Sequence, residues 1–347
     1  MNDKTPMRTV YFDYLRVFAT LAVVILHVSA SAQSSTDVNS SEWMVFNCFN
    51  SAVRWGVPVF VMISGALFLN RDIGLRKMYS KYILRLAVAF VFWSAIYAIV
   101  RNGSNTDKII SFVKGEDHLW YIFLIIGIYM CFPFIRQIVV SEKMIKYFLL
   151  LSLIFTFVIP ECVRLMSDFG NEFVVKLGEA VNNDLYNMTL RIPSGYVGYF
   201  ILGYYLDKTD LKKHKRTVIY FSGIIGFVFT VLLTLAVSLK AQQVQDYYNN
   251  LYVNVLVMAV AVFVLFYNAK FEDKKINKIM QKLSKYRFGV YLVHPAVISL
   301  LNKAFVLNTM TFNPVISVIV ISGIAFAVSY IISGILNKVP YANKYIV

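Results

Sequence analysis

The chain of 347 residues is 58% hydrophobic and 16% aromatic, and it carries a formal net charge of +15. A soluble domain contains roughly 45–50% apolar residues, so this composition, with a mean hydropathy of +0.62, excludes an ordinary soluble protein. Apolar runs long enough to cross a bilayer recur along almost the whole chain, which predicts an all-α, polytopic membrane protein.

Ten spans are expected, in a single membrane-embedded domain with no appended soluble domain. They cover residues 11–32, 43–69, 82–100, 119–139, 145–162, 194–207, 217–239, 251–269, 287–307 and 314–336. The sixth is short and rich in glycine and tyrosine, and the longest polar insertion is 161–193. The N-terminal MNDKTPMR shows no signal-peptide cleavage pattern, so the first span is expected to be retained.

Lysine and arginine alternate between the two sides of this arrangement. With the N-terminus inside, the cytoplasmic segments hold 24 of the 34 Lys and Arg residues and the outer loops hold 8. Cytoplasmic loops of membrane proteins carry such an excess, so both termini are predicted to be cytoplasmic, with 33–42 and 161–193 outside. The net charge then reflects topology and contact with membrane lipids, and no nucleic-acid partner is expected.

The two remaining cations lie inside spans, and Arg16 in the first span is accompanied by His27. Eleven residues are three turns plus about 20°, so both side chains share one stripe, about 16 Å apart along the helix. Asp13, one turn before Arg16, can pair with it. Snorkelling by Arg16 and an interhelical hydrogen bond by His27 are the structural alternatives. Together the two residues indicate a polar track from the cytoplasmic face into the membrane.

Polar residues in other spans extend this track. Arg54 lies near the middle of the second span, where a charge costs roughly 2.5–3.5 kcal/mol on insertion scales and needs a partner or polar cavity. His118 opens the fourth span at a depth where it can meet His27. His294 lies in the ninth, where the following Pro295 removes a helix hydrogen bond and can open the helix locally.

These segments resemble the acyltransferase-3 family of ten-helix membrane proteins that O-acylate surface glycans. The matching segments, in family order, are DYLRVFATLAVVILH, RWGVPVFVMISGALF, HLWYIFLIIGIY, RIPSGYVGYFILGYYL and FGVYLVHP. Arg16 and His27 fit the family's Arg-x10-His signature. The pattern is most similar to membrane-only members such as enterobacterial common antigen O-acetyltransferase and the intercellular-adhesin succinyltransferase. One departure concerns the family's Arg-x-x-Arg motif, because SKYILRL has Arg85 but places Tyr82 at the first arginine, next to Lys81.

The resemblance implies acyl-CoA, with acetyl-CoA expected, as cytoplasmic co-substrate and no metal. The acceptor is a glycan or lipid-linked sugar, and the location is a bacterial cytoplasmic (inner) membrane. CoA phosphates need cations at the inner face. The candidates for this donor site are Arg16, Arg76, Lys77, Lys81 and Arg85.

His27 is the candidate general base for a sugar hydroxyl. A transient acyl-imidazole on His27 is the alternative, and the sequence does not separate the two. Arg54 or His118 can stabilise the oxyanion. Trp120 and Tyr121 are expected to stack on the sugar, and Asp13 and His294 to support the site.

A transporter or flippase of the same glycans is the competing interpretation, because ten helices with intramembrane charge suit it as well. No clear internal repeat favours it. Cys48, Cys131 and Cys162 lack ligand spacing and are expected to be packing residues. The sequence specifies neither the acyl group nor the acceptor sugar.

Overall fold

A computed structural model describes residues 10–101, 103–189, 191–305 and 307–347, except for the side chains of 191–194. Every regular element in these ranges is a helix, which confirms the predicted all-α class. The first nine residues, which contribute Lys4 and Arg8 to the topology argument, lie outside the described residues. The side of the membrane on which the chain begins stays a prediction.

The first half of the chain forms α1 to α8, with short helical turns between them. Their bounds are α1 Val10–Gln33, α2 Ser41–Ala52, α3 Gly56–Phe68, α4 Leu75–Lys77, a π-helical turn Met78–Ile83, α5 Leu84–Val100, α6 Asn105–Lys114, a 3-10 turn Asp117–Leu119, α7 Trp120–Met130 and α8 Phe132–Ile138. The second half comprises α9 Glu142–Ser152, a π-helical turn Leu153–Val158, α10 Ile159–Phe169, α11 Glu172–Met188, α12 Arg191–Lys208, α13 Lys213–Ala241, α14 Val253–Asn268, α15 Lys274–Phe305, α16 Pro314–Leu336 and a π-helical turn Ala342–Ile346.

Seven segments of the described chain are long and apolar enough to cross a membrane. An eighth is present if α6–α7 and α8, bent by 64°, form one broken span. This identifies a multi-pass membrane protein. The other two predicted spans correspond to α12, which carries charged residues at both ends, and to α14, an apolar helix of only 16 residues. The count of ten membrane crossings is therefore not established by length and hydropathy.

Prolines accompany irregularities in three of the predicted spans. The predicted span 43–69 is interrupted by a turn at 53–55 and the span 119–139 at Cys131, whereas in the span 145–162 the helix continues through a π-helical turn. A proline ring clashes with the carbonyl four residues earlier. Pro58, Pro133 and Pro160 lie just after these three irregularities. Arg54 consequently lies in a turn between two helices rather than inside a continuous helix.

Helices also occupy segments that were expected to be loops. α11 lies within the polar insertion 161–193, and α15 begins at Lys274 rather than at 287. The expected local opening at Pro295 does not occur, because α15 continues unbroken through it. Packing of α15 against both α1 and α16 holds it in place.

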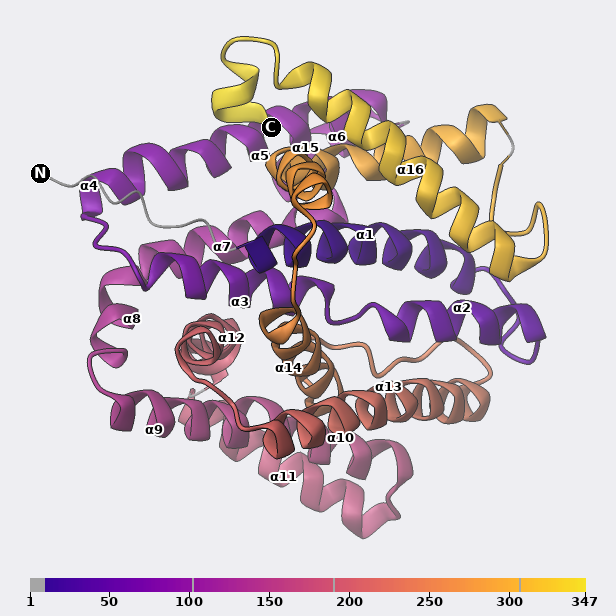
Figure 1. Cartoon of the computed structure of the whole chain (residues 1–347). Helices are drawn as coiled ribbons and strands as arrows, with labels where there is room; N and C mark the ends of the chain where they lie inside the picture. The colour runs from indigo at the N-terminus through magenta and orange to yellow at the C-terminus, as the bar shows by residue number, and fades with distance from the viewer. Residues whose placement is uncertain (1–9, 102, 190, 306) are drawn as a thin grey trace, which may run out of the picture.

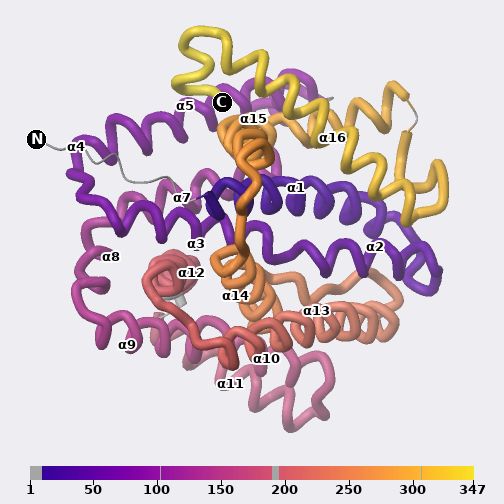
Figure 2. The backbone as a smooth tube through the Cα atoms, viewed as in Figure 1, coloured from indigo at the N-terminus to yellow at the C-terminus, as the bar shows by residue number. Residues whose placement is uncertain are grey.

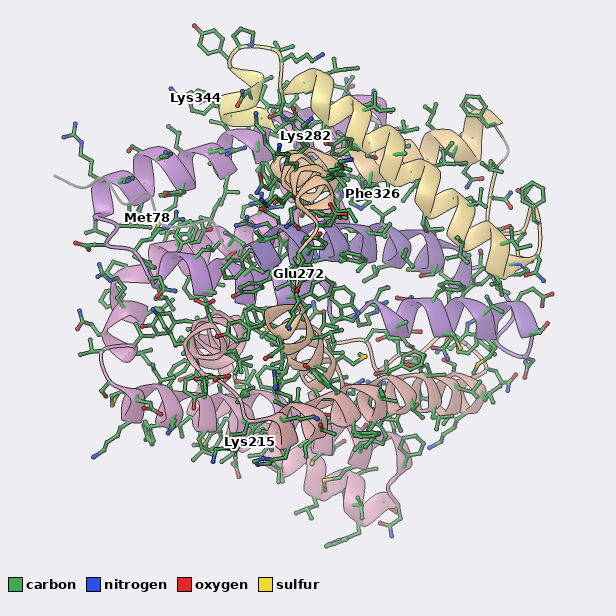
Figure 3. The ribbon with its side chains drawn as sticks, viewed as in Figure 1. Met78, Lys215, Glu272, Lys282, Phe326 and Lys344 are labelled. Atoms are coloured by element: carbon green, nitrogen blue, oxygen red, sulfur yellow. The ribbon has the colours of Figure 1, made fainter. Side chains whose placement is uncertain are left out.

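α1 lies in the middle of the molecule and packs against α2, α3, α15 and α16 (Figures 1 and 2). Side chains fill the spaces between these ribbons (Figure 3). α3 is fixed from its other side by α12 at very short range. A Cβ on Gly65 would lie 1.7 Å from the backbone oxygen of Phe200, and one on Gly203 would lie 2.0 Å from that of Met62. Small residues of this kind let membrane helices approach closely, so α12 holds α3 in place next to α1.

Candidate active site

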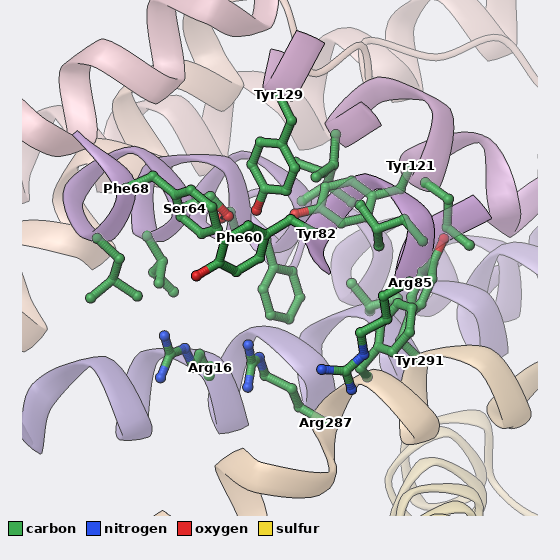
Figure 4. A pocket seen from close by; sticks show the side chains of 18 of the residues that line it. Arg16, Phe60, Ser64, Phe68, Tyr82, Arg85, Tyr121, Tyr129, Arg287 and Tyr291 are labelled. Carbon is green, nitrogen blue, oxygen red and sulfur yellow. The ribbon is translucent and has the colours of Figure 1, made fainter. Parts of the chain in front are cut away.

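A cavity of about 300 Å³ lies among α1, α3, α5, α7 and α15 (Figure 4). Its lining combines positive charge with aromatic rings. The cations are Arg16, Arg85, Lys285 and Arg287, and the aromatic residues are Phe60, Phe68, Tyr82, Tyr121, Tyr129, Phe288 and Tyr291. In Figure 4 the three guanidinium groups lie along one side of this cationic cavity and most of the labelled rings along the other.

The charged side of the cavity carries more cations than acids. Arg16 pairs with buried Asp13, their Nη1 and Oδ1 atoms being 3.5 Å apart, as predicted. Arg287 donates to the backbone oxygen of Ser284 at 2.8 Å and lies in electrostatic range of Arg85. Arg85 donates to the backbone oxygen of Val347 at 2.5 Å. The surplus positive charge makes this side of the cavity suited to an anion.

Three histidine rings lie close together, beyond one end of the cationic cavity. The ring centroids of His27 and His294 are 5.0 Å apart, those of His118 and His294 5.7 Å, and those of His27 and His118 6.4 Å. The predicted meeting of His27 and His118 is thus confirmed. His118 and His294 are buried, and within the described part of the chain their Nε2 atoms have no hydrogen-bond partner. His294 Nδ1 lies 3.2 Å from the oxygen of Val290, which is consistent with Nδ1 carrying the proton and Nε2 a lone pair.

The cationic cavity ends about one helical turn from this histidine cluster on each of the three helices concerned. Its lining includes Val23, four residues before His27, and Ile122, four residues after His118. It also includes Tyr291, three residues before His294, whose hydroxyl donates to the backbone oxygen of His118. Arg16 therefore lines the cavity and His27 lies about one turn beyond its end, on the same side of α1 as their spacing predicts.

Arg54 approaches the cluster from the turn between α2 and α3. It is half-buried, and it lies close enough to His27 to interact with it electrostatically. Its guanidinium donates to Asn50 Oδ1 and stacks over the ring of Tyr248, with Cζ 3.9 Å from the ring centroid. The same electrostatic range includes Asp117, the neighbour of His118.

Trp120 and Tyr121 face different spaces. Tyr121 lines the cationic cavity, whereas Trp120, 42% exposed, lines a second, polar cavity of about 630 Å³. This polar cavity is also lined by Arg101, Glu116 and Asp117. It begins next to His118, since Asp117 precedes that histidine directly.

The predicted donor-binding cations divide in the same way. Arg16 and Arg85 line the cationic cavity. Arg76, Lys77 and Lys81 are exposed and do not line it; Lys81 Nζ instead lies 6.0 Å from the ring centroid of Tyr82. A donor-binding role for these three residues stays a prediction.

Sequence reasoning missed Lys285 and Arg287, which it counted only as cytoplasmic charges. The signal was present in the spacing of α15. Arg287 lies seven residues before His294, close to two full turns, so the two share one face of the helix. This repeats on α15 the arrangement of Arg16 and His27 on α1.

No group of three or more His, Cys, Asp or Glu side chains within the described ranges is placed to hold a metal ion.

Comparison with known proteins gives one match: residues 9–334 fit the profile of the acyltransferase-3 family, described as an acyltransferase domain. No curated protein and no solved structure matches the chain. The resemblance to the two named glycan acyltransferases therefore stays a prediction.

Proposed function

The chain belongs to the acyltransferase-3 family, and we propose from this premise that it transfers an acyl group from cytoplasmic acyl-CoA to a hydroxyl of a surface polysaccharide or lipid-linked glycan. Acetyl-CoA is the expected donor. Membership of this family makes the protein an acyltransferase, which favours an enzyme over the transporter or flippase that the sequence left open.

The observation that carries the proposal is a cationic cavity whose far end lies one helical turn from three histidines. The guanidinium groups of Arg16, Arg85 and Arg287 suit the CoA phosphates, because Arg binds phosphate oxygens through two parallel N–H donors. The aromatic side of the cavity suits the less polar pantetheine arm. A donor bound in this way would direct its thioester toward His27.

His27 acts as the general base in the transfer step. The acceptor oxygen adds to the thioester carbonyl carbon while its proton passes to the His27 imidazole, which forms a tetrahedral intermediate with a negatively charged oxygen. The C–S bond then breaks, and the CoA sulfur takes the proton from His27. The products are the O-acyl ester and free CoA, with no acyl-histidine intermediate.

The polar cavity beside His118 supports the proposal that the acceptor binds there. Trp120 offers an exposed ring face for stacking on a sugar, and Glu116 and Asp117 offer carboxylates for its hydroxyls. Donor and acceptor would then reach the histidine cluster from different sides. The topology that fits this use has ten spans and both termini cytoplasmic in a bacterial cytoplasmic membrane, with the cationic cavity accessible from inside.

The direct test supplies purified protein in lipid nanodiscs with acetyl-CoA radiolabelled in the acetyl group. We expect thioester consumption and, with envelope glycan extracts, label on glycan that mild alkali removes as acetate. Label that stays on the protein without acceptor would overturn direct transfer, and the absence of both hydrolysis and transfer would overturn the proposed function.

A further inference from the structure

A buried network of neutral polar side chains lies behind Arg54. Asn50 Nδ2 donates to Gln33 Oε1 at 2.8 Å, and Gln33 Nε2 donates to the Tyr248 hydroxyl oxygen at 2.9 Å. The Tyr248 hydroxyl in turn donates to Asn47 Oδ1 at 2.7 Å. All four residues are buried. They come from α1, from α2 and from the segment between α13 and α14, so the network joins three separate parts of the fold.

The network is anchored at its far end and its phenol stays neutral. Asn47 Nδ2 donates to the backbone oxygen of Val231 on α13 at 3.1 Å. Burial raises the pKa of Tyr248 to about 12, so its hydroxyl keeps its proton at neutral pH. Buried polar groups that are hydrogen-bonded in this way form a rigid unit. Arg54 is held by the near end of that unit, at Asn50 Oδ1 and the face of Tyr248.

Neutral partners leave the charge of Arg54 uncompensated. In the described ranges Arg54 forms no ion pair with a carboxylate, and its buried Nε has no hydrogen-bond partner. Asp246, which interacts with Arg54 electrostatically, is itself exposed to solvent. A cation in this state is costly unless an anion forms next to it. The space beside His27 is where the proposed reaction would form one.

We propose that Gln33, Asn47, Asn50 and Tyr248 are positioning residues that aim the Arg54 guanidinium at the oxyanion of the tetrahedral intermediate. This inference rests on the proposed acyl transfer at His27. The network orients the Arg54 guanidinium without neutralising its charge, whereas a carboxylate partner would neutralise it. Preorganised cations and donors of this kind stabilise the transition state more than the ground state.

The first test compares two adjacent tyrosines. Tyr248→Phe keeps the ring under Arg54 but removes the hydroxyl that joins Gln33 to Asn47. Tyr247→Phe is the matched control, since that residue is equally buried but its hydroxyl donates to Asp168, outside the network, at 2.8 Å. In nanodiscs with acetyl-CoA, we expect kcat for hydrolysis and transfer to fall about tenfold or more in Tyr248→Phe, with KM for acetyl-CoA unchanged. Equal losses in the two variants would overturn the inference.

The second test gives Arg54 a carboxylate partner. Asn50→Asp places a carboxylate against the guanidinium and also removes the Nδ2 donor to Gln33 Oε1, so kcat should fall about tenfold or more in a protein that still folds. Full activity in a folded Asn50→Asp protein would overturn the inference. Tyr248→Phe should also add little to the loss in Arg54→Lys, whereas fully additive losses would show that the network acts independently of Arg54. Wild-type protein without any hydrolysis or transfer would instead refute the proposed function.

Discussion

His27 lies where the end of the cationic cavity, two further histidines and Arg54 approach one another. A sugar hydroxyl is a poor nucleophile at neutral pH, so a positioned imidazole has a clear use here. His27→Gln keeps hydrogen-bonding capacity but does not accept and release a proton. We expect it to lower kcat by about a hundredfold to ten-thousandfold, the usual range for a lost general base, with little change in KM for acetyl-CoA.

Exposed His214 in the first turn of α13 provides the control, because His214→Gln should leave kcat unchanged. Steady-state rates of acetyl-CoA consumption in nanodiscs measure both variants. Near-normal turnover by a folded His27→Gln protein would remove His27 as the base and leave His118 and His294 as candidates.

Arg287 provides the second prediction at this scale. Arg287→Gln removes a charge from the cationic cavity, and a hydrogen bond to a charged group contributes about 1.5–3 kcal/mol, so KM for acetyl-CoA should rise about tenfold or more. Lys282→Gln is the control, since Lys282 lies on the same helix, is exposed and does not line the cavity (Figure 3). Lys81→Gln tests the alternative donor site that the sequence predicts outside the cavity. If Lys81→Gln raises KM for acetyl-CoA and Arg287→Gln does not, the assignment of the cavity as the donor site is wrong.

Helical periodicity accounts for how much of the site the sequence predicts. The spacing of Arg16 and His27 places both correctly on α1, because a continuous helix lies between them. Hydropathy does not single out Arg287, because it places the start of the ninth span at that residue, although α15 begins thirteen residues earlier. The surroundings of Arg54 are not predictable from the sequence, since Tyr248 reaches Arg54, and Gln33 reaches Asn50, only through tertiary packing.

At the scale of the elements, hydropathy predicts where spans lie but not where they break. Pro58 and Pro133 interrupt spans that read as continuous apolar runs, and the first of these breaks places Arg54 in a turn. The hydropathy profile likewise does not predict the close contact of α3 with α12, because glycine changes the local hydropathy little. It depends on two glycines that admit the neighbouring backbone.

This contact yields a stability prediction. Gly65→Ala would place a methyl group 1.7 Å from the backbone oxygen of Phe200, so α3 and α12 would have to separate. Overpacking of this kind costs about 1–3 kcal/mol, and we expect a lower thermal unfolding temperature in detergent together with lower kcat. Gly334→Ala on α16 is the control, since its added methyl group meets nothing within 4 Å. Equal unfolding temperatures for the two variants would contradict the packing.

For the whole molecule, the topology fixes which solution each cavity can reach. The proposed donor, acyl-CoA, is cytoplasmic, so its proposed site requires a cationic cavity that is accessible from inside, and the excess of Lys and Arg predicts the same orientation. The structure supplies seven or eight candidate spans and leaves the orientation to experiment. The relevant exposed positions are Ser35 and Asn171, expected outside, and Lys275, expected inside.

Cysteine labelling in whole cells tests this orientation. Cys131 and Cys162 are exposed and Cys48 is partly so, and all three are first replaced by serine. In that background Ser35→Cys and Asn171→Cys should react with a membrane-impermeant maleimide, while Lys275→Cys should react only after the cells are permeabilised. Because Lys275 lies near the start of α15, labelling of Lys275→Cys in intact cells would place the end of the helix that carries Lys285 and Arg287 outside. That result would separate the cationic cavity from the cytoplasmic donor and overturn its assignment as the acyl-CoA site.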